Sequence, residues 1–96
     1  MVNGLEVIRR FETRFPLWLA EEGDPVGLHI GELNRNIERI MVTLDVRPEV
    51  VAEAIEKHVD LIIAKHPPIF RPIQRLTPEN PQTKMYLDLI KHDIAV

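Results

Sequence analysis

Two short apolar segments on either side of one amphipathic stretch constrain the fold of this chain more than any other feature. Residues 39–45 and 60–64 are rich in β-branched side chains, as is typical of strands that are covered on both faces. Between them, Pro48 suits the first turn of a helix, and apolar residues then recur at helical spacing to about His58. The pattern predicts a βαβ unit with parallel strands and a right-handed crossover.

Further elements are predicted before this unit. Asn3 can cap a helix that Pro16 ends, because proline lacks an amide donor and restricts the residue before it. Residues 26–30 alternate apolar side chains with small or polar ones and predict a short, half-buried strand. The apolar residues of the first helix, which we expect in the core, are Leu5, Ile8, Phe11 and Phe15.

A helix and a third strand are predicted after the unit. The helix spans about residues 81–92, and residues 93–96 resemble another parallel strand. Three prolines in residues 67–72 exclude regular structure there. The side chains expected on the inner face of the helix are Met85, Tyr86, Leu89 and Ile90.

The length indicates one domain over residues 1–96, and the predicted elements make it an α/β domain with a mainly parallel sheet flanked by helices. A chain of 96 residues builds a single core. No apolar run approaches the ~20 residues of a membrane span, and no signal peptide is recognisable, so we expect a cytoplasmic protein. The lack of cysteine excludes disulfides and thiolate metal sites, and a net charge of −3 argues against general nucleic-acid binding.

The candidate functional residues follow the two central strands. Ligands of parallel α/β sheets gather outside the carboxyl ends of the strands, where Asp45 and the pair Lys65–His66 should converge. Imidazole and carboxylate groups bind divalent ions, so His66 is either a metal ligand or catalytic residue, or a loop cap. Asp45 is a metal ligand, a general base, a residue that orients His66, or an acid at a helix N-terminus.

Several positively charged residues lie next to His66 and in the loop that follows it. Lys65, Arg71 and Arg75 form a basic loop that either binds a phosphate or carboxylate or simply faces solvent. Next to a divalent ion, the Lys65 ammonium would have to deprotonate, turn away or replace the ion.

The other histidines and the aromatic residues have structural interpretations. His58 and His92 end predicted helices, where the helix dipole favours a positive charge. His29 is expected on the outward face of its strand. We interpret Phe15, Trp18 and Phe70 as packing residues.

Three segments in order resemble the Nif-three-like family, also catalogued as GTP cyclohydrolase I type 2-like. The Asp-Leu-Ile-Ile-Ala-Lys-His-Pro-Pro-Ile-Phe-Arg-Pro run at 60–72 resembles its signature, and residues 26–31 are similar to its Gly-Leu-Gln-Val-Gly segment. Leu44-Asp45, followed by Pro48-Glu49-Val50-Val51, is the third match. The resemblance runs from Asn3 to Val96 and implies the N-terminal portion of a longer dinuclear metal-binding protein.

The resemblance implies that two adjacent histidines help to hold a pair of divalent ions. The second of these positions is His66, but the first is Lys65, which is a poor ligand at neutral pH. The tryptophan that usually precedes Asp24 is replaced by Gly23. The family's remaining ligands, an aspartate and a His-x-x-x-Glu element, come from later in the longer relatives.

The leading functional hypothesis from this resemblance is a metal-dependent hydrolase for a small nucleotide-like or phosphorylated substrate. The candidate ions are zinc, iron, manganese and magnesium. The ion would lower the pKa of a water molecule bound to it. Asp45 would be the base or the residue that orients His66. Lys65 and Arg71 would contact the anionic substrate. The alternative is a non-enzymatic, ring-forming scaffold or regulatory binding protein. The resemblance also implies a homo-oligomer.

Overall fold

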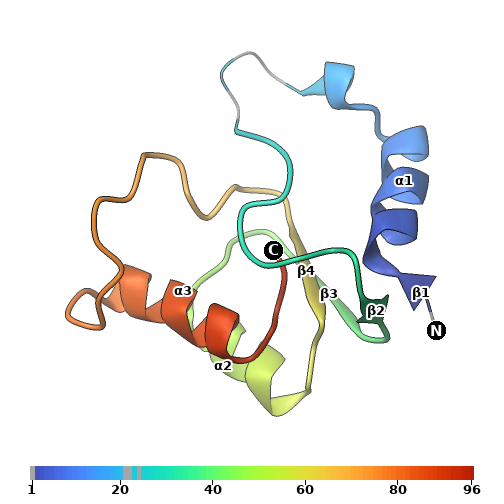
Figure 1. Ribbon diagram of the computed structural model, residues 1–96. Coiled ribbons are helices and arrows are strands. Elements are labelled where there is room, and N and C mark those ends of the chain that lie inside the picture. The colour runs from blue at the N-terminus through green and yellow to red at the C-terminus, as the bar shows by residue number, and fades with distance from the viewer. Residues whose placement is uncertain (1, 21–22, 24) are drawn as a thin grey trace.

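The computed structural model describes residues 2–20, 23 and 25–96. It is an α/β structure in which short strands alternate with helices (Figure 1). None of the described helices is long and apolar enough to cross a membrane. The elements in chain order are β1 (Val2–Asn3), α1 (Gly4–Arg14), the 3-10 turn η1 (Leu17–Leu19), β2 (Asn36–Ile37), β3 (Ile40–Thr43), α2 (Pro48–Glu56), β4 (Leu61–Ala64) and α3 (Pro81–Lys91).

The predicted parallel βαβ arrangement is confirmed as β3–α2–β4. The two strands pair in parallel, with Ile40 opposite Leu61 and Thr43 opposite Ala64. The last segment forms a single parallel bridge between Ala95 and Leu61, so the predicted third strand is reduced to one residue pair. Pro48 stands in the first turn of α2, as its missing amide donor predicts.

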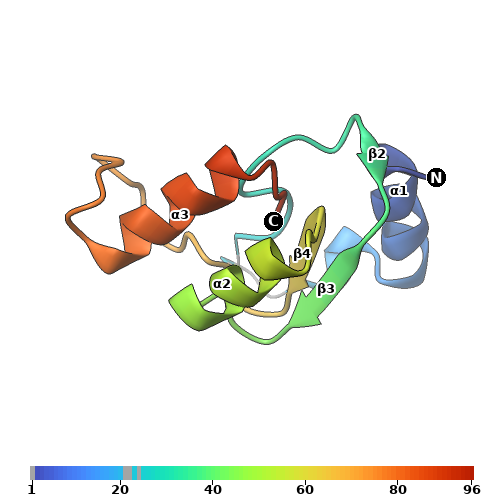
Figure 2. The ribbon, with the colours of Figure 1, turned by 90° about the horizontal axis from the view of Figure 1, so that it is seen from below.

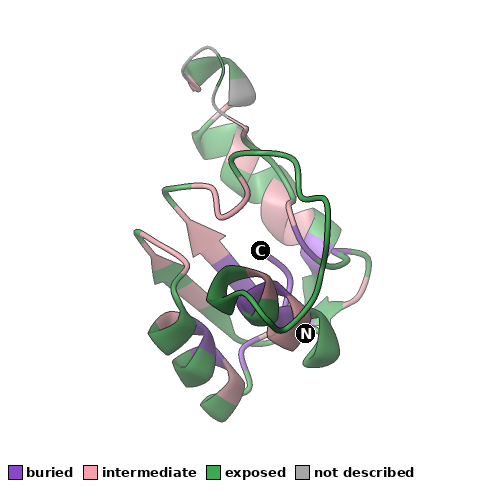
Figure 3. Cartoon of the chain, turned by 90° about the vertical axis from the view of Figure 1, so that its left-hand side faces the viewer, coloured by how far each residue is buried: buried purple, intermediate pink, exposed green. Residues whose placement is uncertain are grey.

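The main core lies between the sheet and the two helices α2 and α3. Figure 2 shows both helices on the same side of β3 and β4, with α1 on the other. Burial is concentrated around β4 and the segment that leads to the C-terminus (Figure 3). The buried residues of this core are Ile30, Val51, Ala54, Val59, Ile62, Met85, Tyr86, Leu89, Ile94 and Val96. Ile90, predicted to face inward, is exposed instead.

The opposite face of the sheet is covered only in part. Helix α1 contributes Val7 and Ile8 to a smaller cluster with Leu61, but β3 lies outside it. Ile40, Val42 and Leu44 are therefore exposed, Val42 to 77%. We call these three side chains the bare face. The prediction that residues 39–45 are covered on both faces was wrong for this side of the sheet.

The N-terminal helix starts as predicted but is less buried than expected. The side chain of Asn3 accepts a hydrogen bond from the backbone amide of Leu5, and the helix ends before Pro16. A short antiparallel pairing of β1 with β2 ties this start to residues 36–37, and the sequence analysis missed it. Leu5, Phe11 and Phe15 are exposed, because α1 extends beyond the small sheet.

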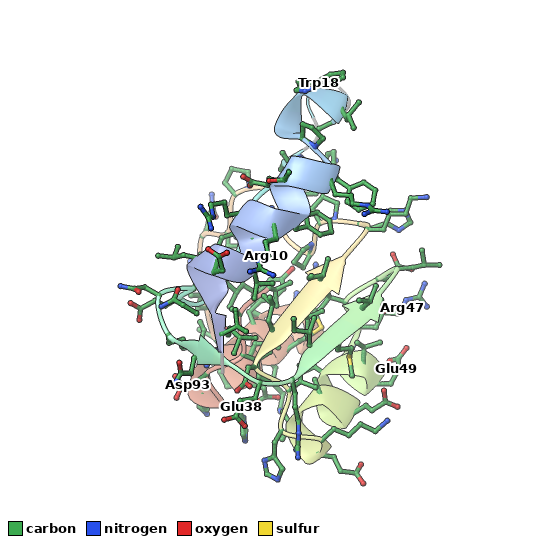
Figure 4. All side chains as sticks on the ribbon, turned by 90° about the vertical axis from the view of Figure 1, so that its right-hand side faces the viewer. Arg10, Trp18, Glu38, Arg47, Glu49 and Asp93 are labelled. Carbon is green, nitrogen blue, oxygen red and sulfur yellow. The ribbon has the colours of Figure 1, made fainter. Side chains whose placement is uncertain are left out.

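Two other sequence predictions were wrong. Residues 26–30 form no strand, although Ile30 exchanges backbone hydrogen bonds with Val96. The aromatic residues Trp18 and Phe70, interpreted as packing residues, are exposed. Figure 4 shows Trp18 at the far end of the segment after α1, away from the sheet.

Candidate functional site

The parallel pairing of β3 and β4 brings Asp45 and His66 together. Backbone hydrogen bonds continue beyond the strands, from the amide of Lys65 to Thr43 O at 3.1 Å and from the amide of His66 to Leu44 O at 2.9 Å. The segments that follow β3 and β4 thus leave the sheet side by side. The Nδ1 of His66 lies 2.7 Å from the Oδ1 of Asp45, so the predicted convergence is confirmed.

The contact defines which nitrogen of His66 carries a proton. A carboxylate oxygen can only accept a hydrogen bond, so the Nδ1–H of His66 must donate. In the neutral imidazole, the lone pair then remains on Nε2. A histidine whose other ring nitrogen donates to a carboxylate is the usual arrangement of a metal-ligating imidazole.

Asp45 also interacts with Arg47 and Thr43. The hydrogen bond from His66, aided by the nearby Arg47, holds the pKa of Asp45 below its ordinary value, although desolvation opposes the shift. The Arg47 guanidinium lies 3.4 Å from Asp45 Oδ2, and Figure 4 shows Arg47 beyond the end of β3. The hydroxyl of Thr43 donates to the backbone carbonyl of Asp45 at 3.0 Å. The pair remains accessible, because the side chain of His66 is 59% exposed and that of Asp45 is 40% exposed.

The predicted anion-binding residues Lys65, Arg71 and Arg75 are all exposed. Lys65 precedes His66 and is exposed, and it lines the groove described below. Arg71 and Arg75 lie in residues 71–80, all of which are exposed. Among the described residues, Arg71 makes no hydrogen bond or ion pair with Asp45 or His66.

The residues present match one metal-ligand position. The side chain of His66 is 59% exposed, and in the neutral imidazole that donates through Nδ1 the lone pair of Nε2 is available to a divalent ion. Within the part of the chain that the structure describes, no three His, Cys, Asp or Glu side chains are grouped to hold an ion. A site at His66 therefore needs further ligands from outside these residues.

His29 is not the surface residue that the sequence suggested. Its ring is partly buried, with Nε2 2.5 Å from the carbonyl of Pro25 and Nδ1 accepting from the amide of Ile69. The prediction assumed a regular alternating strand, and the irregular path of residues 26–30 turns the imidazole toward the proline-rich loop, residues 67–72. By contrast, His58 follows α2 and His92 caps α3, as predicted.

An apolar groove of about 370 Å³ lies beside the strand ends. Helix α1 contributes Ile8, Phe11 and Phe15 to it, and β4 contributes its length from Leu61 to Ala64. Lys65 is the cationic group of the lining, and Glu12 is an acidic one. The groove and the His66–Asp45 pair thus share the end of β4.

Comparisons with known proteins identify the family of this chain. A family model described as Duf34/NIF3 (NGG1p interacting factor 3) matches residues 2–96. The chain is 59% identical to a protein of Streptococcus pneumoniae named "GTP cyclohydrolase 1 type 2 homolog", over 95% of this chain and 34% of that protein. A Bacillus subtilis protein of the same name is 52% identical over 99% of this chain and 26% of its own length.

Solved structures show the same fold. A Bacillus cereus protein related to NIF3 superposes with a TM-score of 0.94 at 44% identity, over 98% of this chain and 26% of that one. HcgD from Methanocaldococcus jannaschii superposes with a TM-score of 0.90 at 32% identity, over 98% of this chain and 38% of that one. This chain spans about a quarter to a third of the length of the curated relatives it matches. On this evidence, the chain belongs to the Duf34/NIF3 family.

Proposed function

We propose that this chain provides His66 as one ligand of a divalent-metal site in a metal-dependent hydrolase. The observation that carries the proposal is the 2.7 Å contact between His66 Nδ1 and Asp45, which in the neutral imidazole leaves the lone pair on Nε2 of an exposed side chain. Zinc, iron, manganese and magnesium are the candidate ions. When bound, such an ion supplies Lewis-acid activation of water.

In this proposal, the residues of the chain have distinct tasks. Asp45 orients the imidazole by accepting a hydrogen bond from its Nδ1–H, or acts as the base. Lys65, next to His66, offers a positive charge to an anionic substrate, and Arg71 is a second cation from the following loop. The substrate class is nucleotide-like or phosphorylated small molecules, an assignment supported by the similarity to proteins named "GTP cyclohydrolase 1 type 2 homolog".

The remaining ligands belong, on this proposal, to protein outside these 96 residues. The relatives are roughly three to four times as long as the matched region, and His66 lies at an exposed end of the sheet where a further segment can approach. We also propose a homo-oligomeric, cytoplasmic protein.

The first test is the response of the four histidines to metal. Ring signals of 15N-labelled protein are followed by NMR during titration with Zn²⁺. We expect the Nε2 signal of His66 to shift first. His66→Ala removes the site, whereas His92→Ala, at an exposed helix end, is the matched control. Binding that is the same in wild type and His66→Ala would contradict the assignment.

The second test concerns Lys65 and hydrolysis. Lys65→His should raise the amount of metal bound per chain, measured by elemental mass spectrometry. Hydrolysis of nucleotides and phosphate esters is then compared with and without chelator. Activity that chelation leaves unchanged would count against a metal enzyme, and stoichiometric metal without hydrolysis would favour the scaffold function.

A further inference from the structure

One peptide unit of the proline-rich loop is held from both of its ends. Its carbonyl belongs to Pro68 and its amide to Ile69. The hydroxyl of Tyr86 donates to Pro68 O at 2.6 Å, while Nδ1 of His29 accepts from the Ile69 amide at 3.4 Å. The two side chains come from segments 57 residues apart in the sequence and meet on opposite sides of this peptide.

Tyr86 is a rigid anchor for the carbonyl. It lies on α3 and is only 3% exposed, and its ring belongs to the main core. Its hydroxyl also accepts a hydrogen bond from Gln82 Nε2 at 2.7 Å, one helical turn earlier. This bond leaves the hydroxyl proton directed at Pro68, whose carbonyl also accepts a longer hydrogen bond from Gln82 Nε2 at 3.4 Å.

The tautomer of His29 allows its Nδ1 to accept the hydrogen bond from the Ile69 amide. The carbonyl of Pro25 can only accept, so Nε2 of His29 must donate to it. The neutral ring then has its lone pair on Nδ1, facing the Ile69 amide. His29 and His66 therefore have opposite tautomers, and each is set by the acceptor beside it.

The loop has few other ways to be fixed through its backbone. Pro67 and Pro68 have no amide hydrogens, so the amide of Ile69 is the first available donor after His66. The peptide held by Tyr86 and His29 is thus close to the ligand candidate, and it limits how far the chain at His66 can turn from Asp45.

We propose that His29 and Tyr86 are positioning residues that hold this peptide and thereby keep the imidazole of His66 on Asp45. The proposal rests on the proposed role of His66 as a metal ligand for its functional meaning. Its physical content, the orientation of His66, is measurable in the chain without metal.

The test uses one variant of each positioning residue. Tyr86→Phe keeps the buried ring and removes the donor to Pro68. His29→Leu removes the acceptor for Ile69, and His29→Gln restores it, because an amide side chain has both an acceptor and a donor. The control is His58→Asn at an exposed position.

Two readouts follow the loop and the site separately. Amide hydrogen exchange of Ile69 should accelerate roughly tenfold in His29→Leu and Tyr86→Phe, as expected for loss of about one hydrogen bond. The 15N ring shifts of His66 should move from the Nδ1–H form toward a mixture of tautomers. Both values should return to those of the wild type in His29→Gln and stay there in His58→Asn.

The outcomes are distinguishable. Wild-type exchange at Ile69 and an unchanged His66 tautomer in Tyr86→Phe would overturn the proposal, even if His29→Leu fails to fold. If Zn²⁺ does not perturb His66 in the wild type while the variants alter its tautomer, the metal function fails and the positioning role stands.

Discussion

The side chains of Asp45 and His66, 21 residues apart in the sequence, meet at 2.7 Å because the strands that precede them are parallel and in register. Each residue is the second one after the end of its strand. The close approach of these two residues therefore originates in the parallel pairing within the βαβ unit.

Asp45→Asn tests what the carboxylate does for His66. The amide nitrogen of Asn can donate to Nδ1, which would move the ring proton to Nε2 and block the ligand atom. We expect the Zn²⁺ affinity of His66 to fall by roughly 10- to 100-fold, as for other residues that orient a metal ligand. The affinity is measured by NMR titration. Arg47→Ala, which removes only the distant 3.4 Å partner, is the control, and equal affinities in all three proteins would refute the orienting role.

Asp60 should make stability depend on acid pH. Its carboxylate accepts the backbone amides of Glu38 and Arg39 at 2.8 and 3.1 Å. Desolvation raises the pKa of Asp60, but these hydrogen bonds and the neighbouring arginines outweigh it and lower the pKa overall. The contribution is thus complete above the unfolded pKa of about 3.9 and is lost as the pH falls through the folded value.

The measurement is urea unfolding of wild type and Asp60→Asn between about pH 6 and pH 2. We expect wild type to be the more stable protein at the upper end, with the difference shrinking as the pH falls. A difference that stays constant over this range would show that the carboxylate charge does not matter.

Gly4→Ala should destabilise the start of α1. A Cβ atom at Gly4 would lie 2.3 Å from the backbone oxygen of Leu33, and backbone cannot yield as a flexible side chain does. We expect a loss of about 1–3 kcal/mol in the free energy of unfolding, as for other overpacked sites. Glu56→Ala on the exposed side of α2 should stay within about 0.5 kcal/mol. Thermal and urea denaturation give both values, and a neutral Gly4→Ala would mean that the helix start shifts freely.

The two faces of the sheet should respond differently to polar or smaller side chains. Val42, on the bare face, is 77% exposed, whereas Ile62, in the main core, is 1% exposed. Val42→Thr should change the free energy of unfolding by less than about 0.5 kcal/mol and reduce self-association in sedimentation experiments. Ile62→Ala should cost about 2–5 kcal/mol. A large loss of stability in Val42→Thr would indicate that the bare face is packed in solution.

The βαβ unit could be predicted from sequence because its signals are local. Pro48 marks the helix start, and the two apolar runs identify the strands whose ends bear Asp45 and His66. The coverage of the sheet could not be predicted in this way. An apolar run shows that a strand can be buried, but Val42 is exposed because α1 lies over β4 rather than β3.

The restriction to local signals also explains why the position of His66 was predicted and the contacts of His29 were not. The position of His66 follows from its strand, whereas the role of His29 depends on Ile69, 40 residues away, and on a non-repetitive backbone. Tyr86 was correctly predicted as a core residue from helical spacing, but the spacing gave no sign of the partner of its hydroxyl. Contacts of irregular segments carry no periodic signal, so these two residues appear only in the folded structure.

The unequal covering of the sheet predicts how the molecule opens under native conditions. Helices α2 and α3 pack directly against each other and share the main core with β4, so they should exchange their amide hydrogens only through the largest unfolding event. Helix α1 is joined through a two-residue strand pairing and a small cluster, and it can detach while the rest stays folded. Such a partial opening would widen the groove beside β4 without separating Asp45 from His66.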